Sequence, residues 1–161
     1  MRKILIFGNS GSGKSTLAKE FSIKHTLPHF DLDTIAWRNS NPPVRAELED
    51  SSEKIKAFIN TNSAWVIEGC YSDLLSIAIA DANEVIFLNP GIEVCIENCK
   101  SRPWEPHKYE TIEKQNENLE MLLHWVKAYW KRDDEFSFSS HLKLFSEFVG
   151  NKVEYKSNLR S

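Results

Sequence analysis

An eight-residue run near the start of the chain, Gly8-Asn9-Ser10-Gly11-Ser12-Gly13-Lys14-Ser15, matches the pattern G-x-x-x-x-G-K-[ST] at every fixed position. The apolar residues 3–7 before it are typical of a buried strand, and residues 16–25 after it are typical of a helix. The alternative is a turn rich in glycine and serine that carries a lysine by chance, but such a turn requires neither a strand before it nor a helix after it. The run in this context therefore predicts a loop that binds nucleotide phosphates.

The residue types in this run have separate physical roles. Gly8 ends the strand, while Gly11 and Gly13 let the backbone approach an anion without a Cβ in the way. The loop amides then converge on phosphate oxygens, helped by the positive end of the helix dipole. Lys14 is expected to reach the β- and γ-phosphates and to act in catalysis, and the Ser15 hydroxyl to bind Mg²⁺. We expect ATP and Mg²⁺ to be held by Gly8, Asn9, Ser10, Gly11, Ser12, Gly13, Lys14, Ser15 and Thr16.

Composition narrows the class of protein. A chain of 161 residues is expected to form one domain, residues 1–161. Its formal net charge of -3 provides no basic field, which argues against nucleic acid as a partner, and no apolar run is long enough to span a membrane. Three cysteines without a C-x-x-C pair and the absence of a signal peptide predict a cytoplasmic protein. Nothing indicates an oligomeric state.

Strand and helix patterns alternate along the chain. Strands are expected at 3–7, 27–33, 64–68, 84–89 and 152–156, and helices at 15–26, 44–60, 72–80, 91–101, 110–131 and 138–149. This alternation predicts a three-layer α/β/α domain with a parallel sheet and ligands at the carboxyl ends of its strands. Residues 34–62 are expected to form an acceptor-binding insert, and residues 102–110 a lid.

Acidic residues end two of the expected strands. Asp31 and Asp33 flank Leu32, so strand alternation predicts that they point to opposite faces. Asp33 is expected to take the proton of an acceptor hydroxyl or to organise Mg²⁺, and Asp31 to contact substrate, although acids at strand ends are also common turn caps. Glu68 ends the apolar strand 64–68, where an acid can hold Mg²⁺ or its waters and contact substrate. Tyr71 lines the acceptor pocket or packs in the core.

Few arginines are available to neutralise phosphate charge. Arg102, in front of a loop bounded by prolines, is expected to act in catalysis from the lid, with His107 and Lys108 as helpers, or else to complement a helix dipole. Arg38 is expected to clamp the acceptor, and Arg45 to face an anionic ligand. The remaining histidines, His25, His29, His124 and His141, show no ligand spacing and are expected at the surface or core edge. Cys95 and Cys99 fall on a core stripe of helix 91–101.

Three stretches together resemble the small P-loop kinase-like proteins known as DNA topology modulation proteins or adenylate- and shikimate-kinase-like ATPases. They are the run 8–15, the second strand with Asp33 and Trp37, and Trp65-Val66-Ile67-Glu68-Gly69 with Tyr71. The resemblance covers about residues 1–100 and implies the fold of nucleoside monophosphate kinases, a P-loop NTPase fold with strand order 2-3-1-4-5. The pair Asp31-x-Asp33 is similar to that of shikimate kinases, whose second acid binds the acceptor. Their Gly-Gly-Gly segment is missing here.

These patterns predict a small-molecule kinase that transfers the γ-phosphoryl group of Mg·ATP to a hydroxyl-bearing metabolite. With so few arginines, we expect an acceptor with at most one negative charge, anchored by Arg38. Two alternatives remain open: an ATP-binding regulator or slow NTPase whose state is read by a partner, and a nucleoside monophosphate kinase.

Overall fold

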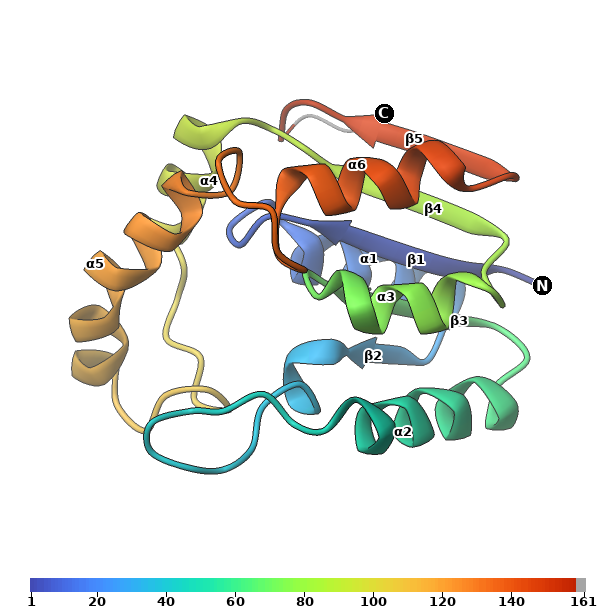
Figure 1. Ribbon diagram of the computed structural model, residues 1–161, viewed down its shortest axis with the longest axis horizontal. Coiled ribbons are helices and arrows are strands. Elements are labelled where there is room, and N and C mark those ends of the chain that lie inside the picture. Colours follow the sequence, from blue (N-terminus) through green and yellow to red (C-terminus); the bar gives the residue numbers. More distant parts are fainter. Residues whose placement is uncertain (159–161) are drawn as a thin grey trace.

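The computed structural model describes residues 1–158 and contains a five-stranded sheet (Figure 1). Its strands are β1 (Lys3–Gly8), β2 (His29–Asp31), β3 (Trp65–Gly69), β4 (Glu84–Leu88) and β5 (Asn151–Tyr155). They are ordered β2-β3-β1-β4-β5, and every neighbouring pair is parallel. The structure thus confirms the predicted parallel sheet and its order.

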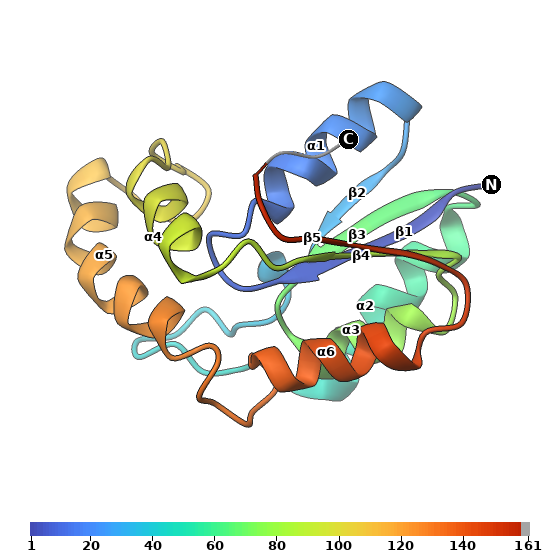
Figure 2. The ribbon, with the colours of Figure 1, turned by 90° about the horizontal axis from the view of Figure 1, so that it is seen from above.

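Helices cover both faces of the sheet (Figure 2). Helix α1 (Lys14–His25) lies on one face, whereas α2 (Leu48–Thr61), α3 (Ser72–Ile79) and α6 (Phe138–Glu147) lie on the other. Helices α4 (Ile92–Lys100) and α5 (Ile112–Lys127) pack together beyond the carboxyl ends of the strands. The predicted three-layer α/β/α architecture is confirmed. Among residues 1–158, no helix is long and apolar enough to span a membrane.

The central strands are buried on both faces because successive side chains alternate between two cores. Ile4 and Ile6 pack in the core beneath α1, while Leu5 and Phe7 belong to the core shared with α2, α3 and α6. A third cluster joins α4 to α5 and contains Cys95, Cys99 and Val126, as the helical stripe predicts. Burial raises the pKa of the Cys95 thiol to about 11, so this cysteine packs as a neutral apolar group.

Three local predictions need correction. The second strand ends at Asp31, and Leu32–Thr34 forms a single 3-10 turn, so Asp31 and Asp33 do not alternate across a strand. The helix expected from residue 44 begins only at Leu48, because Arg45 instead forms an isolated antiparallel bridge with Trp37. His141 lies fully buried in the core, not at its edge.

Candidate active site

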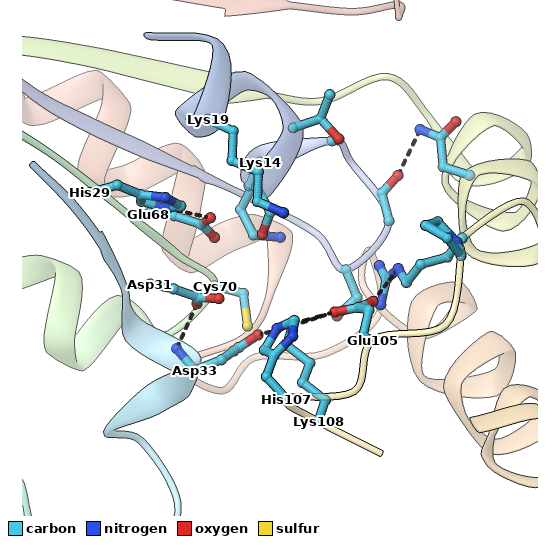
Figure 3. A pocket seen from close by; sticks show the side chains of 18 of the residues that line it. Lys14, Lys19, His29, Asp31, Asp33, Glu68, Cys70, Glu105, His107 and Lys108 are labelled. Carbon is cyan, nitrogen blue, oxygen red and sulfur yellow. Dashed lines mark hydrogen bonds and ion pairs between the residues drawn. The ribbon is translucent and has the colours of Figure 1, made fainter. Parts of the chain in front are cut away.

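A cavity of about 730 Å³ opens at the carboxyl ends of β1, β2 and β3 (Figure 3). One wall is the run 8–15, the phosphate loop, and a second is formed by the strand-end acids. The third is the lid segment, the name used for residues 102–110 because the sequence predicts a lid there; it contains no helix or strand. Ten of the predicted site residues line this cavity: Ser10, Gly11, Gly13, Lys14, Ser15, Thr16, Asp31, Asp33, Glu68 and Arg102.

Close packing explains two glycines of the phosphate loop. A Cβ on Gly8 would lie 2.2 Å from the Leu88 carbonyl oxygen, so a side chain there would collide with β4. Gly11 has a φ of +79°, and a Cβ on it would lie 2.5 Å from the Cys95 carbonyl oxygen of α4. Close packing against α4 therefore requires glycine at position 11, and Gly11 also lines the cavity.

Two side-chain hydrogen bonds, one from the loop and one from α4, tie the same loop to the helices behind it. The Asn9 amide donates to the Val126 carbonyl at 3.1 Å, and the Asn98 amide donates to the Gly11 carbonyl at 2.8 Å. Asn9 and Ser12 are buried, and neither lines the cavity, nor does Gly8. These three residues of the expected nucleotide-binding set thus shape the loop from behind.

Two acids stand side by side on neighbouring strands. Asp31 and Glu68 are register partners in the parallel pair β2–β3. Burial and the charges of Glu68 and Asp33 raise the pKa of Asp31 from 3.8 to about 6. The Glu68 carboxylate is buried and accepts from His29 Nε2 at 3.0 Å. Residues two apart on a strand share a face, so the spacing of His29 to Asp31 could have placed it at the site. It is partly buried and lines the cavity, which agrees with the core-edge position expected for it.

The carboxylate of Asp33 has a protein donor on each oxygen. The Tyr71 hydroxyl donates to Oδ1 at 2.5 Å, and the Lys108 ammonium donates to Oδ2 at 2.8 Å. Trp37 Nε1 in turn donates to the Tyr71 hydroxyl at 2.9 Å, which directs the phenol proton toward Asp33. Burial opposes the charge of Asp33, but the lysine and these hydrogen bonds hold its pKa below the usual value.

The lid segment is organised around Glu105, which the sequence did not indicate. Its carboxylate oxygens lie 3.2 Å from Arg102 Nε, 3.7 Å from His107 Nε2 and 3.3 Å from Lys108 Nζ. All four side chains line the cavity. The lid candidates Arg102, His107 and Lys108 thus come together at the cavity.

The structure does not bring three expected acceptor contacts to the cavity. Arg38 is exposed and pairs with Glu47 at 2.6 Å. Arg45 pairs with Asp73 at 3.0 Å and packs over the Tyr71 ring, so it has a structural environment in place of an anionic ligand. Tyr71 itself is 3% exposed and reaches the cavity only through Asp33.

The donor set fits a magnesium–nucleotide ligand. The left-handed Gly13 leads directly into α1, so the first amides of that helix face the cavity where Lys14, Ser15 and Thr16 line it. The hydroxyl of Ser15 and the carboxylates of Asp31 and Glu68 line the same cavity, and Mg²⁺ prefers such hard oxygen ligands. Among residues 1–158, no group of three or more His, Cys, Asp or Glu side chains can hold a metal by itself.

Comparison with known proteins identifies the fold. A shikimate kinase from Acinetobacter baumannii, solved with shikimate, aligns with a TM-score of 0.57 and 11% identity, covering 99% of this chain and 86% of that one. A sugar kinase from a Janibacter species aligns with a TM-score of 0.51 and 15% identity, covering 96% of this chain and 84% of that one. A gluconokinase from Sinorhizobium meliloti aligns with a TM-score of 0.48 and 15% identity, covering 95% of this chain and 82% of that one. No protein-family model and no curated protein matches the chain.

The sheet order, the phosphate loop and the first two of these neighbours define a protein with the P-loop kinase-like fold. At these identities the likeness shows the fold alone.

Proposed function

We propose that this protein is a phosphotransferase that moves the γ-phosphoryl group of Mg·ATP to a hydroxyl of a small metabolite. The observation that carries the proposal is the convergence, on one cavity, of the phosphate loop, the strand-end acids and the cations of the lid segment. Phosphoryl transfer depends on positioning and charge stabilisation, for which these three walls supply the groups. The small-molecule kinases among the structural neighbours support the same reaction class.

The residues of the cavity have separate roles in this proposed reaction. Lys14 and the loop amides hold phosphate oxygens, while Ser15 and Glu68 would hold Mg²⁺, which neutralises phosphate charge when bound. Asp33, oriented by Tyr71, receives the acceptor hydroxyl, and Asp31 lies beside it. Arg102 of the lid segment neutralises charge that develops on the transferred group.

The experiment is a screen for ADP release from Mg·ATP, in which single metabolites are offered as acceptors. Saturable release that depends on one acceptor supports the proposal. Slow release that no acceptor accelerates would instead favour a regulator or slow NTPase. Fast turnover with AMP, CMP, GMP, UMP or dTMP would make the protein a nucleoside monophosphate kinase.

A further inference from the structure

The acceptor half of the cavity, where β2 and β3 end, is acidic. It contains Asp31, Asp33 and Glu68, all lining the cavity. The two arginines of the neighbouring insert, Arg38 and Arg45, are paired elsewhere with Glu47 and Asp73. Lys14 and Lys19 belong to the phosphate side, on α1 (Figure 3). Among the described residues, the lysine in direct contact with an acid of the acceptor half therefore comes from the lid segment.

That cation is the ammonium group of Lys108. It lies 2.8 Å from Asp33 Oδ2 and 3.3 Å from Glu105 Oε2, with a quarter of its side chain exposed. Lys108 has a long side chain on a segment without helix or strand, whereas Asp33 is anchored by Tyr71 and by its own 3-10 turn. The structure thus seats the Lys108 ammonium group on Asp33, the acid to which the proposed function assigns the acceptor hydroxyl.

Charge balance favours a cation in this place. Over the described lining residues, four carboxylates face four lysines and arginines, so with neutral histidines the cavity wall carries no net charge. Bound Mg·ATP adds negative charge to this wall. An anionic acceptor would add more beside three acids, at short range and in partial burial, whereas a cationic acceptor would reduce it.

We propose that the acceptor is a hydroxyl-bearing amine, of the amino-alcohol or amino-sugar class, whose ammonium group replaces that of Lys108 on Asp33. The inference rests on the proposed phosphotransferase function and names its substrate class. It replaces the expectation of an acceptor anchored by Arg38, because Arg38 lies outside the cavity.

The competing arrangement keeps Lys108 in place as the anchor for an acceptor carboxylate. In that arrangement the anion would have to share a lysine that already contacts Asp33 and Glu105. The two arrangements predict opposite effects of removing the lysine. Lys108→Met frees Asp33 for an amine, but it deletes the binding partner of a carboxylate.

The test uses two matched sets of probes: glucosamine, glucose and gluconate, and serinol, glycerol and glycerate. Binding is measured by calorimetry with a non-hydrolysable ATP analogue and Mg²⁺ present, and ADP release is measured with ATP. The full chain is compared with Lys108→Met, with Asp33→Asn, and with Lys114→Met as the control. Lys114 is an exposed lysine paired with Glu110, and it lines no cavity.

We expect an amine to bind at least about tenfold more tightly than its neutral and anionic counterparts. Lys108→Met should tighten amine binding about three- to tenfold by removing an internal competitor. Asp33→Asn should abolish the preference for the amine, and Lys114→Met should change nothing. Tightest binding by a carboxylate, lost in Lys108→Met, would overturn the inference, as would the absence of saturable binding by either amine.

Failure of the proposed function would look different. If the chain does not bind Mg·ATP, or if no acceptor accelerates ADP release, the phosphotransferase assignment fails, whatever the calorimetry shows for the amines. If a polyol or a hydroxy acid is phosphorylated while the amines are not bound, the function stands and only the substrate class is wrong.

Discussion

The ammonium group of Lys14 donates a hydrogen bond to the backbone carbonyl of Asn9, five residues earlier, at 2.8 Å. The side chain of Lys14 thus folds back over the phosphate loop, and its charge lies at the cavity that the loop lines. A phosphate oxygen placed there receives a charged donor whose position is already restricted, which lowers the entropic cost of the contact.

Lys14→Ala should weaken the binding of Mg·ATP about ten- to hundredfold, because a charge-assisted hydrogen bond contributes roughly 1.5–3 kcal/mol. Isothermal titration calorimetry measures the change. Lys24→Ala is the control, since Lys24 is an exposed lysine in the last turn of the same helix. Equal affinities for the wild-type chain and Lys14→Ala would contradict the assignment of the loop.

Asp33→Asn should lower phosphotransfer on the order of 10²–10⁴-fold while ATP binding survives, because the amide keeps the shape but cannot take a proton. Single-turnover measurements with the acceptor found in the screen, alongside ATP calorimetry, separate the two effects. Asp133→Asn, at an exposed acid outside the cavity, is the control. Full activity in Asp33→Asn would transfer the role of base to Asp31.

Two neighbouring arginines should differ sharply in their effect on stability. Arg45 is 21% exposed, pairs with Asp73 and Glu135, and packs over three aromatic rings, so Arg45→Gln should cost about 2–3 kcal/mol of unfolding free energy. Arg38→Gln should cost about 0–0.5 kcal/mol, because both partners of its ion pair are more than half exposed. Urea denaturation measures both. A fall in acceptor affinity for Arg38→Gln alone would restore the hypothesis that it clamps the acceptor.

Asp31 should make the protein less stable as the pH rises. Its pKa of about 6 in the folded chain exceeds the ordinary 3.8, so the folded state holds the proton more tightly between these values. Unfolding free energy should therefore fall by about 1–3 kcal/mol from pH 4 to pH 6 through this group. Asp31→Asn should remove that fall, whereas Asp81→Asn, at an exposed acid, should not. Identical pH profiles for the wild-type chain and Asp31→Asn would contradict the raised pKa of Asp31.

His141 should make the protein less stable as the pH falls, which is opposite to the effect of Asp31. It donates from Nε2 to the Cys70 carbonyl at 2.7 Å and accepts from the Tyr129 hydroxyl at 2.6 Å, so it is buried in its neutral form. Burial lowers its pKa from 6.5 to about 4. Its contribution is complete above pH 6.5 and is lost as the pH falls toward 4, by roughly 2–3 kcal/mol. His141→Gln should flatten this acid sensitivity, and His124→Gln, at an exposed histidine, should leave it intact.

Much of the fold follows from local pattern. The motif at 8–15 with its flanking strand and helix, the apolar strand cores and the helical stripe at Cys95 and Cys99 are short-range features, and the structure agrees with each. The alternation of strand and helix then leads to a parallel sheet, because a crossover helix is the connection that joins parallel neighbours. Cavity-lining positions for Lys14, Asp31, Asp33 and Glu68 follow from strand ends meeting at one edge.

Tertiary contacts decided which charges face one another. Arg38 and Arg45 stand seven residues apart in one insert, yet Glu47 holds the first at the surface and Glu135, ninety residues later, helps to hold the second in an aromatic cluster. Lys108 meets Asp33 across 75 residues, and Glu105 gathers the cations of the lid segment. No periodicity encodes such pairs, because an ion pair depends on the three-dimensional separation of two side chains and on their burial, which only the packed chain defines.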